Sequence, residues 1–109
     1  MSRGDIVTVV AGGGFGGKPR PAVIIQSNQF ETFFSATVCL FTSDPLDAAL
    51  IRILIEPSTE NGLFALSRLM VDKITTVPAS KIGKRIGRLG KEDLVRLNRA
   101  LAVFLGLAA

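Results

Sequence analysis

A glycine-rich stretch near the start of the chain has the spacing of a nucleotide-binding loop. Gly12, Gly14 and Gly17 fit the pattern G-x-G-x-x-G, and the run ending at Lys18 fits the first seven positions of a P-loop. A P-loop requires Ser or Thr after the lysine, because that hydroxyl binds Mg²⁺, and Pro19 occupies this position. Both motifs must also open a helix, whereas the prolines and the apolar run AVII that follow favour a strand. We therefore interpret the stretch as a loop between two strands and not as a nucleotide site.

The composition excludes several other kinds of chemistry. The chain has a single cysteine, Cys39, and no histidine. It therefore has no internal disulfide and no Cys-rich metal site, and it lacks the commonest metal ligand and the commonest general base. Cys39 lies within the apolar run ATVCLF and is expected to be a buried strand residue. We expect no metal and no cofactor.

Length and hydropathy bound the class of protein. A chain of 109 residues predicts one domain spanning 1–109. Its hydrophobic fraction of 48% is enough for a core, which excludes gross disorder. No apolar run reaches the roughly 18 residues that a transmembrane helix needs, and the N-terminal apolar stretch is too short for a signal peptide. We therefore expect a cytoplasmic protein with no membrane partner.

Positive charge gathers in the last third of the chain. The net charge is +4. The segment 81–99 carries seven basic residues against Glu92 and Asp93, which is +5, so the remainder is about −1. A one-sided basic segment suits a polyanion such as nucleic acid. A solvated surface is the alternative interpretation of the same charge.

Short apolar segments separated by turn residues predict a mainly β protein. The predicted strands are 6–10, 21–27, 36–43 and 50–56, with a fifth inside 63–73 and a sixth that continues from it over 73–78. Their spacing is typical of a small barrel or sandwich. The segment 80–89 is predicted to hold a helical turn and a short strand. From Lys91, Leu94, Leu97, Leu101 and Phe104 recur at helical spacing, which predicts an amphipathic helix that Gly106 ends.

Five motifs occur in one order along the chain: RGDIV, KPRPAVII, CLFTS, MVDKI and IGRL. In this order the sequence resembles the MazF/PemK family of toxin endoribonucleases over nearly its whole length. The resemblance implies a small SH3-like β-barrel (PemK/CcdB-like) with a C-terminal α-helix, and a homodimer. Arg3 and Asp5 of the opening motif are interpreted as structural residues that tie the first strand to a neighbour.

The resemblance also implies an activity. Family members are mRNA interferases that cut single-stranded RNA at sequence-specific sites without a metal. The products carry a 2′,3′-cyclic phosphate and a 5′-hydroxyl, and the loss of mRNA inhibits translation and growth. A cognate antitoxin blocks the RNA groove with a segment that orders on binding. The partners expected of this chain are therefore single-stranded RNA, an antitoxin protein and a second copy of itself.

Three residues match catalytic positions of the family. Arg20, between two prolines, has the planar fork that suits phosphate contact, and we expect it to stabilise transition-state charge. Thr42 offers a hydroxyl to the phosphate oxygens. Asp72 is a candidate base for the 2′-OH, a role that a pKa raised by partial desolvation would favour. The alternatives are a surface arginine, a turn-forming threonine, and an aspartate paired with Lys73 or another basic residue.

Four further residues are expected to bind RNA: Lys18, Ser43, Lys73 and Phe15. Phe15, alone among glycines, is a candidate for stacking on a base or on the antitoxin, or else it folds over the barrel. The phenylalanines of FETFF are also stacking candidates, with core capping as the alternative. The sequence departs from one branch of the family, which carries an arginine two residues before the acid, where this chain has Met70. Either Arg20 and Lys73 supply the positive charge, or activity is weaker.

Two other functions remain open on the same fold. CcdB-type toxins inhibit DNA gyrase through the C-terminal helix and have no nuclease activity. A catalytically weakened relative would still dimerise and bind an antitoxin. The arginine of PRP and the threonine at the strand end favour the nuclease, but one fold hosts different functions.

Overall fold

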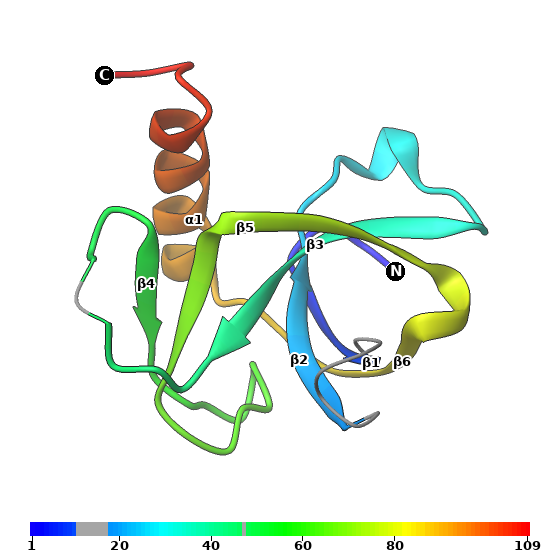
Figure 1. Cartoon of the computed structure of the whole chain (residues 1–109). Coiled ribbons are helices and arrows are strands. Elements are labelled where there is room, and N and C mark those ends of the chain that lie inside the picture. The colour runs from blue at the N-terminus through cyan, green and yellow to red at the C-terminus, as the bar shows by residue number, and fades with distance from the viewer. Residues whose placement is uncertain (11–17, 47) are drawn as a thin grey trace.

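Among the residues that the structure describes, one antiparallel sheet and one long helix form the fold (Figure 1). The computed structural model describes residues 1–10, 18–46 and 48–109. Their elements are β1 (Asp5–Val10), β2 (Pro19–Ile24), η1 (Asn28–Phe30), β3 (Ser35–Thr42), β4 (Arg52–Ile55), β5 (Ser67–Pro78), η2 (Ala79–Lys81), β6 (Ile82–Arg88) and α1 (Lys91–Phe104). The strand order is β4-β5-β3-β2-β1-β6. The predicted mainly β fold with a C-terminal helix is confirmed, and the barrel stays open between the edge strands β4 and β6.

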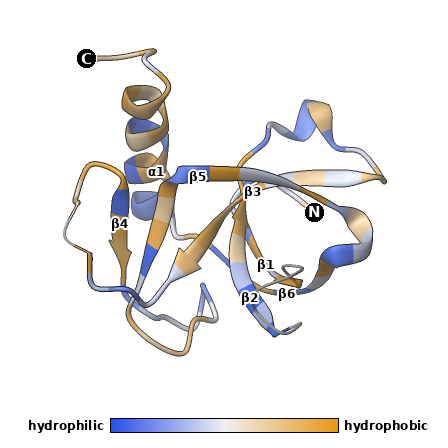
Figure 2. Cartoon of the chain, viewed as in Figure 1, coloured by the Kyte–Doolittle hydropathy of each residue, from blue (hydrophilic) through white to orange (hydrophobic). Residues whose placement is uncertain are grey.

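The central strands are buried on both faces because the sheet curls around itself. In β1, Ile6 belongs to one core cluster and its neighbour Val7 to another, as expected when successive side chains point to opposite faces. In β2, Val23 and Ala22 divide between the same two clusters. Figure 2 shows that β2 is hydrophobic over its later part and hydrophilic where it begins. Two cores explain how a chain of this size holds several strands rigidly in register.

Helix α1 closes the larger core against β4 and β5. Leu97 and Leu101 are buried there, whereas Phe104, the last residue of the predicted apolar stripe, is 43% exposed. Gly106, at φ +77°, ends the helix, and Leu107 N–H bonds to the Ala102 carbonyl at 2.8 Å. This is the capping geometry that only glycine adopts without strain. The predicted helix start and stop are confirmed, and no helix in the described ranges is long and apolar enough to cross a membrane.

Strand β5 is one bent strand, not the two that the sequence predicted. Cys39 of β3 pairs with Ile74, but Phe41 pairs with Leu69, so residues 70–73 all lie opposite Leu40. Extra residues on one strand form a bulge that bends it and changes where its side chains point. Figure 1 shows this bend above β3. Asp72 and Lys73 lie in this bulge, just past the last residue of β5 that pairs with β4.

The loop between β4 and β5 is held by one buried asparagine. Asn61 is 2% exposed; its Oδ1 accepts hydrogen bonds from the N–H groups of Ser58 and Leu63 at 2.9 and 3.0 Å. Its Nδ2 donates to the Glu56 carbonyl at 2.8 Å. These bonds satisfy the loop's backbone groups internally. The loop therefore has a defined shape, and it presents the fully exposed ring of Phe64 next to β6.

Candidate active site

Two prolines open a cleft between β2 and β3. Strand β2 begins at Pro19, two residues earlier than predicted, and runs to Ile24. Its pairing with β3 begins only at Ala22, which lies opposite Leu40. Proline cannot donate to a strand ladder, so the two strands separate at the proline side. Continuing the same register places Arg20 across from Thr42, at the point where the strands part.

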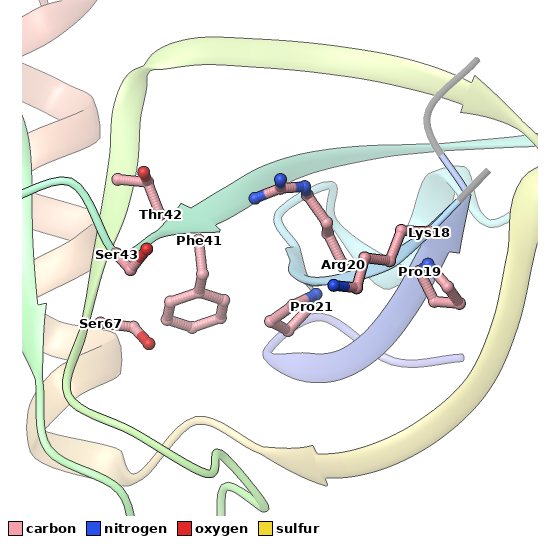
Figure 3. Close-up of a pocket in the computed structure, with 8 residues that line it drawn as sticks. All are labelled: Lys18, Pro19, Arg20, Pro21, Phe41, Thr42, Ser43 and Ser67. Atoms are coloured by element: carbon pink, nitrogen blue, oxygen red, sulfur yellow. The ribbon is translucent and has the colours of Figure 1, made fainter. Parts of the chain in front are cut away.

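Arg20 and Thr42 line two adjoining cavities. The smaller has a volume of about 250 Å³. The larger, of about 440 Å³, extends toward β4 and β5. Figure 3 shows Arg20 of β2, and Lys18 just before β2, extending toward the side of the pocket where Phe41, Thr42 and Ser43 lie at the end of β3. The smaller cavity is lined by Lys18, Pro19, Arg20, Pro21, Phe41, Thr42, Ser43 and Ser67. The structure thus brings together four residues that the sequence singled out.

Thr42 makes a local turn interaction and still has a hydroxyl hydrogen to donate. Its Oγ1 accepts a hydrogen bond from the Asp44 N–H at 3.1 Å, which is the local turn interaction expected of threonine. A hydroxyl that accepts one bond still carries its own hydrogen to donate. Because Thr42 also lines both cavities, that hydrogen is available to an anion in the cleft.

Asp72 forms an ion pair with Arg52 of β4. Arg52 Nε donates to Asp72 Oδ1 at 2.8 Å, and Nη2 donates to Oδ2 at 3.1 Å. The side chains are 8% and 21% exposed. The sequence left open a pair with Lys73 or another basic residue, and the structure has the latter. Arg52 lies opposite Met70, so Asp72, two residues further along β5, is its diagonal neighbour on the same face.

This ion pair sets the pKa of Asp72. The hydrogen bonds from Arg52 lower the pKa of the Asp72 carboxyl, and they outweigh the opposing effect of burial. The expectation that partial desolvation raises the pKa of Asp72 is therefore wrong. The pKa of Arg52 is raised by the same bonds. Both groups are charged at neutral pH, and the carboxylate is committed to the guanidinium.

Sequence reasoning missed Arg52. Arg52 lines the cavity of about 440 Å³ together with Arg20, Thr42 and Lys73. Met70 of β5 carries no charge, but Arg52 lies opposite it on β4 and brings a positive charge to the same cavity. The signal in the sequence is an arginine in the middle of the apolar run LIRILI, since arginine is almost never buried without a partner. Figure 2 shows the hydrophilic segments that interrupt β4 and β5.

A third cavity continues the cleft on the β6 side. Its volume is about 780 Å³, and it shares four lining residues with the smallest cavity: Lys18, Pro19, Pro21 and Ser67. Phe64 lines it, as do Lys84 and Arg85 of β6. Three connected cavities thus form one groove, which we call the basic groove. Part of the basic C-terminal segment borders it, whereas Arg96 and Arg99 of α1 line a separate cavity.

The remaining predicted residues have different outcomes. Lys73 is exposed and borders the larger cavity, whereas Phe15 lies outside the residues that the structure describes. The phenylalanines of FETFF are exposed by 68%, 94% and 83%, so the idea that they cap the core is wrong. Cys39 is free and buried as predicted, and burial raises its thiol pKa to about 12, which makes it unreactive. Within the described ranges, no three metal-ligating side chains come together.

Comparison with known proteins agrees with this geometry. The chain is 53% identical over 108 residues to a probable endoribonuclease MazF of Mycolicibacterium smegmatis, with 99% of each chain covered. It superposes on an endoribonuclease in complex with its cognate antitoxin from a mycobacterial species with a TM-score of 0.79 at 20% identity, covering 100% of this chain and 98% of the other. A MazE–MazF structure from Deinococcus radiodurans gives a TM-score of 0.79 at 17% identity, covering 99% and 98%.

The two solved structures, at 20% and 17% identity, show a shared fold. The M. smegmatis protein, at 53% identity, is also similar in sequence over nearly the whole chain. The model of the PemK-like, MazF-like toxins of type II toxin–antitoxin systems matches residues 2–105. That range includes every element from β1 to α1. The chain belongs to the PemK-like, MazF-like family of toxins of type II toxin–antitoxin systems.

Proposed function

We propose that the protein is a sequence-specific endoribonuclease toxin that cuts single-stranded mRNA without a metal and so inhibits translation and growth. The observation that carries this proposal is the convergence of Arg20 and Thr42 where two cavities of the basic groove meet. The identity of 53% to a probable endoribonuclease MazF supports it.

The proposed reaction is an internal transfer within the RNA. The ribose 2′-oxygen attacks the adjacent phosphorus as the 2′-OH loses its proton, and the bond from phosphorus to the 5′-oxygen breaks. The leaving oxygen takes up a proton. The products are a 2′,3′-cyclic phosphate and a 5′-hydroxyl, so no water is consumed and no redox partner is needed. The main demand on the protein is to stabilise the extra negative charge on the phosphoryl oxygens.

Arg20 and Thr42 are suited to that demand. Arg20 is charged at any relevant pH and donates in a fork that matches two phosphoryl oxygens. Its position on a strand flanked by prolines restricts its backbone. Thr42 faces it from β3 and donates a neutral hydrogen bond. We assign Lys18, Ser43 and Lys73 to flanking phosphates, because they border the same two cavities.

The basic groove offers a path for a single strand. Single-stranded nucleic acid is bound by positive charge along its backbone and by aromatic rings on which bases stack. Lys73, Arg20, Lys18 and Lys84 follow one another along the connected cavities. Phe64 is fully exposed and lines the cavity of about 780 Å³, where its ring can stack on a base. We therefore propose that RNA runs from the bend of β5 past Arg20 to β6.

The proposed partners follow from the same family membership. A related endoribonuclease has been solved with its cognate antitoxin, so we propose that an antitoxin segment inhibits this protein by occupying the basic groove. We propose a homodimer in the cytoplasm as the active form. Exposed apolar side chains at the end of α1 and just after it, Phe104, Leu105 and Leu107, provide a surface for self-association.

The decisive experiment is cleavage of a long single-stranded RNA in EDTA, with the cut ends mapped by primer extension. We expect discrete cuts by the wild-type protein and a loss of about 1,000-fold in Arg20→Ala. Arg99→Ala is the matched control, because Arg99 is an exposed arginine of α1 away from the groove. Equal cutting by Arg20→Ala would remove Arg20 from the mechanism. No cutting by the wild type would overturn the proposal and favour the gyrase inhibitor, which a supercoiling assay detects.

A further inference from the structure

Stability alone does not explain why a charged pair, Arg52 and Asp72, occupies this position instead of an apolar one. Arg52 is 8% exposed in a strand whose other residues are apolar. Removing charges from water costs several kcal/mol for each ion, and a well-packed apolar pair of similar volume is often as stable or more so. A short edge strand that carries a buried arginine is therefore better explained by what the guanidinium does at the surface that it reaches.

The geometry leaves part of that guanidinium uncommitted. Nε and Nη2 are occupied by the two carboxylate oxygens of Asp72. No hydrogen bond to Nη1 occurs among residues 1–10, 18–46 and 48–109. The same side chain lines the larger cavity together with Arg20 and Thr42. One edge of Arg52 is thus fixed by Asp72, and the remaining donors are left for an anion in the cleft.

We infer that Arg52 is a second phosphate-binding arginine of the cleavage site and that Asp72 is its positioning residue. The inference rests on the proposed RNA cleavage. Arg20 reaches the scissile phosphate from β2, and Arg52 reaches it from β4, across the same cavity. The developing charge on the phosphoryl oxygens is then met by two guanidinium groups and by the Thr42 hydroxyl.

Asp72 contributes to this arrangement in two ways. A long arginine side chain loses rotamer freedom when it binds, and a carboxylate that fixes it beforehand removes part of that cost. Arg20, Arg52 and Lys73 also border one cavity, where like charges repel. The negative charge of Asp72 reduces that repulsion when the cleft is empty. Because its pKa is lowered, the carboxylate stays ionised and available for both tasks.

The test compares Arg52→Gln, Arg52→Lys and Asp72→Asn with a matched arginine variant. Arg96→Gln is the control, because Arg96 is also paired with an aspartate, Asp93, at 2.8 Å and also bonds to β4, through the Leu54 carbonyl at 2.9 Å. It lines a different cavity. Three quantities are measured for each variant: single-turnover cleavage of a one-site RNA over a pH series, affinity for the same RNA with a 2′-O-methyl group at that site at several salt concentrations, and thermal unfolding.

The expected results separate binding from structure. Arg52→Gln should cleave about 100-fold more slowly, and its log affinity should depend on log salt with a slope smaller by about one. Arg52→Lys should fall between, because it keeps the charge without the fork. Asp72→Asn should lose about tenfold in rate with an unchanged acidic limb of the pH profile, since its role is to position Arg52. Arg96→Gln should stay within about threefold of wild type.

Several results would overturn the inference. A folded Arg52→Gln that cleaves and binds like wild type excludes Arg52 from phosphate contact. A missing acidic limb in Asp72→Asn, with Arg52→Lys fully active, would make Asp72 the base. Should Arg52→Gln not fold, the double variant Arg52→Met with Asp72→Leu restores an apolar pair, and wild-type cleavage by it overturns the inference. Wild-type protein that neither cuts nor binds RNA overturns the proposed function and this inference together.

Discussion

Two arginine–aspartate pairs cross between strands at opposite edges of the sheet, and they differ in which member is buried. At the β1–β6 edge, Asp5 Oδ1 lies 3.2 Å from Arg85 Nε, with side-chain exposures of 9% and 52%. At the β4–β5 edge, Arg52 is 8% exposed and Asp72 is 21% exposed. The first pair buries the aspartate, and the second pair buries the arginine.

The difference separates a structural pair from a pair that serves the cleft. Asp5 also accepts the Ser2 N–H at 2.8 Å, so the buried carboxylate ties the chain start, β1 and β6 together, as the sequence predicted for the opening motif. Arg52 has one fixed edge and a cavity in front of the other. Both oxygens of the buried Asp5 carboxylate have partners within the fold, so it holds the fold. The buried Arg52 has donors beyond those bonded to Asp72, so it can bind an anion.

The strongest test of the structural edge is Gly87→Ala in β6. A Cβ at Gly87 would overlap the backbone of Glu60 and Asn61, and backbone cannot move aside as a side chain does. We expect a loss of about 3 kcal/mol in the free energy of unfolding, measured in urea, with normal cleavage per folded molecule. Gly90→Ala is the control, because it meets only the end of the Glu60 side chain. Equal stability of the two variants would contradict the tight packing of the loop on β6.

The next largest effect is expected for Asp5→Asn. Asp5 is 6% exposed, its Oδ2 accepts a hydrogen bond from the Ser2 N–H and its Oδ1 forms an ion pair with Arg85, so the uncharged amide cannot satisfy both partners. We expect about 2 kcal/mol of destabilisation in urea unfolding, with cleavage unchanged in buffer where the variant is fully folded. Asp72→Asn should show the reverse, a smaller stability loss and a larger loss of cleavage. The comparison fails if a fully folded Asp5→Asn is inactive.

The pH dependence of stability sharpens the contrast. Because Arg52 holds the pKa of Asp72 below its ordinary value, the folded state binds this proton more weakly than the unfolded state. The stabilising contribution is therefore complete above the unfolded pKa of about 4 and is lost as the pH falls through the lower folded pKa. The stability difference between wild type and Asp72→Asn should be present at pH 6 and shrink at pH 3. A difference that is constant with pH would mean that the carboxylate is not bonded in this way.

The exposed phenylalanines extend the comparison from pairs to surfaces. Phe64 borders the basic groove, whereas Phe33, 94% exposed, follows η1 and borders none of the groove cavities. Phe64→Ala should weaken binding of 2′-O-methyl RNA by about fivefold, since stacking on one base is worth about 1–3 kcal/mol. Phe33→Ala should bind RNA like wild type. Equal losses, measured by fluorescence anisotropy, would place the RNA on another path.

The smallest effect is expected for Arg85→Gln. Arg85 forms an ion pair with Asp5 and is 52% exposed. It lines the cavity of about 780 Å³. A screened surface charge contributes little, so we expect RNA affinity to fall about threefold at low salt and the difference to disappear at high salt. A loss as large as that of Arg52→Gln, in the same titration, would remove the distinction between the two pairs.

Much of the fold was readable because it depends on neighbours in sequence. The helix from Lys91 to its stop at Gly106 follows from apolar spacing and glycine conformation, and both were predicted correctly. The strands were found because they are apolar and bounded by turn residues. The boundaries of β2 and β5 were not found, because a proline-tolerant strand start and a bulge depend on which strand lies alongside.

The sequence by itself determined the family, the apolar strands and the C-terminal helix, and it named Arg20 and Thr42 as candidates, because each is carried by a short run of adjacent residues. Tertiary structure alone decided that Asp72 would meet Arg52, which lies 20 positions away. That contact depends on the β4–β5 register and on the bulge opposite Leu40. The hydrogen bonds from Arg52 lower the carboxyl pKa against the opposing effect of burial, so the aspartate that the sequence offered as a candidate base is the ion-pair partner of a buried arginine.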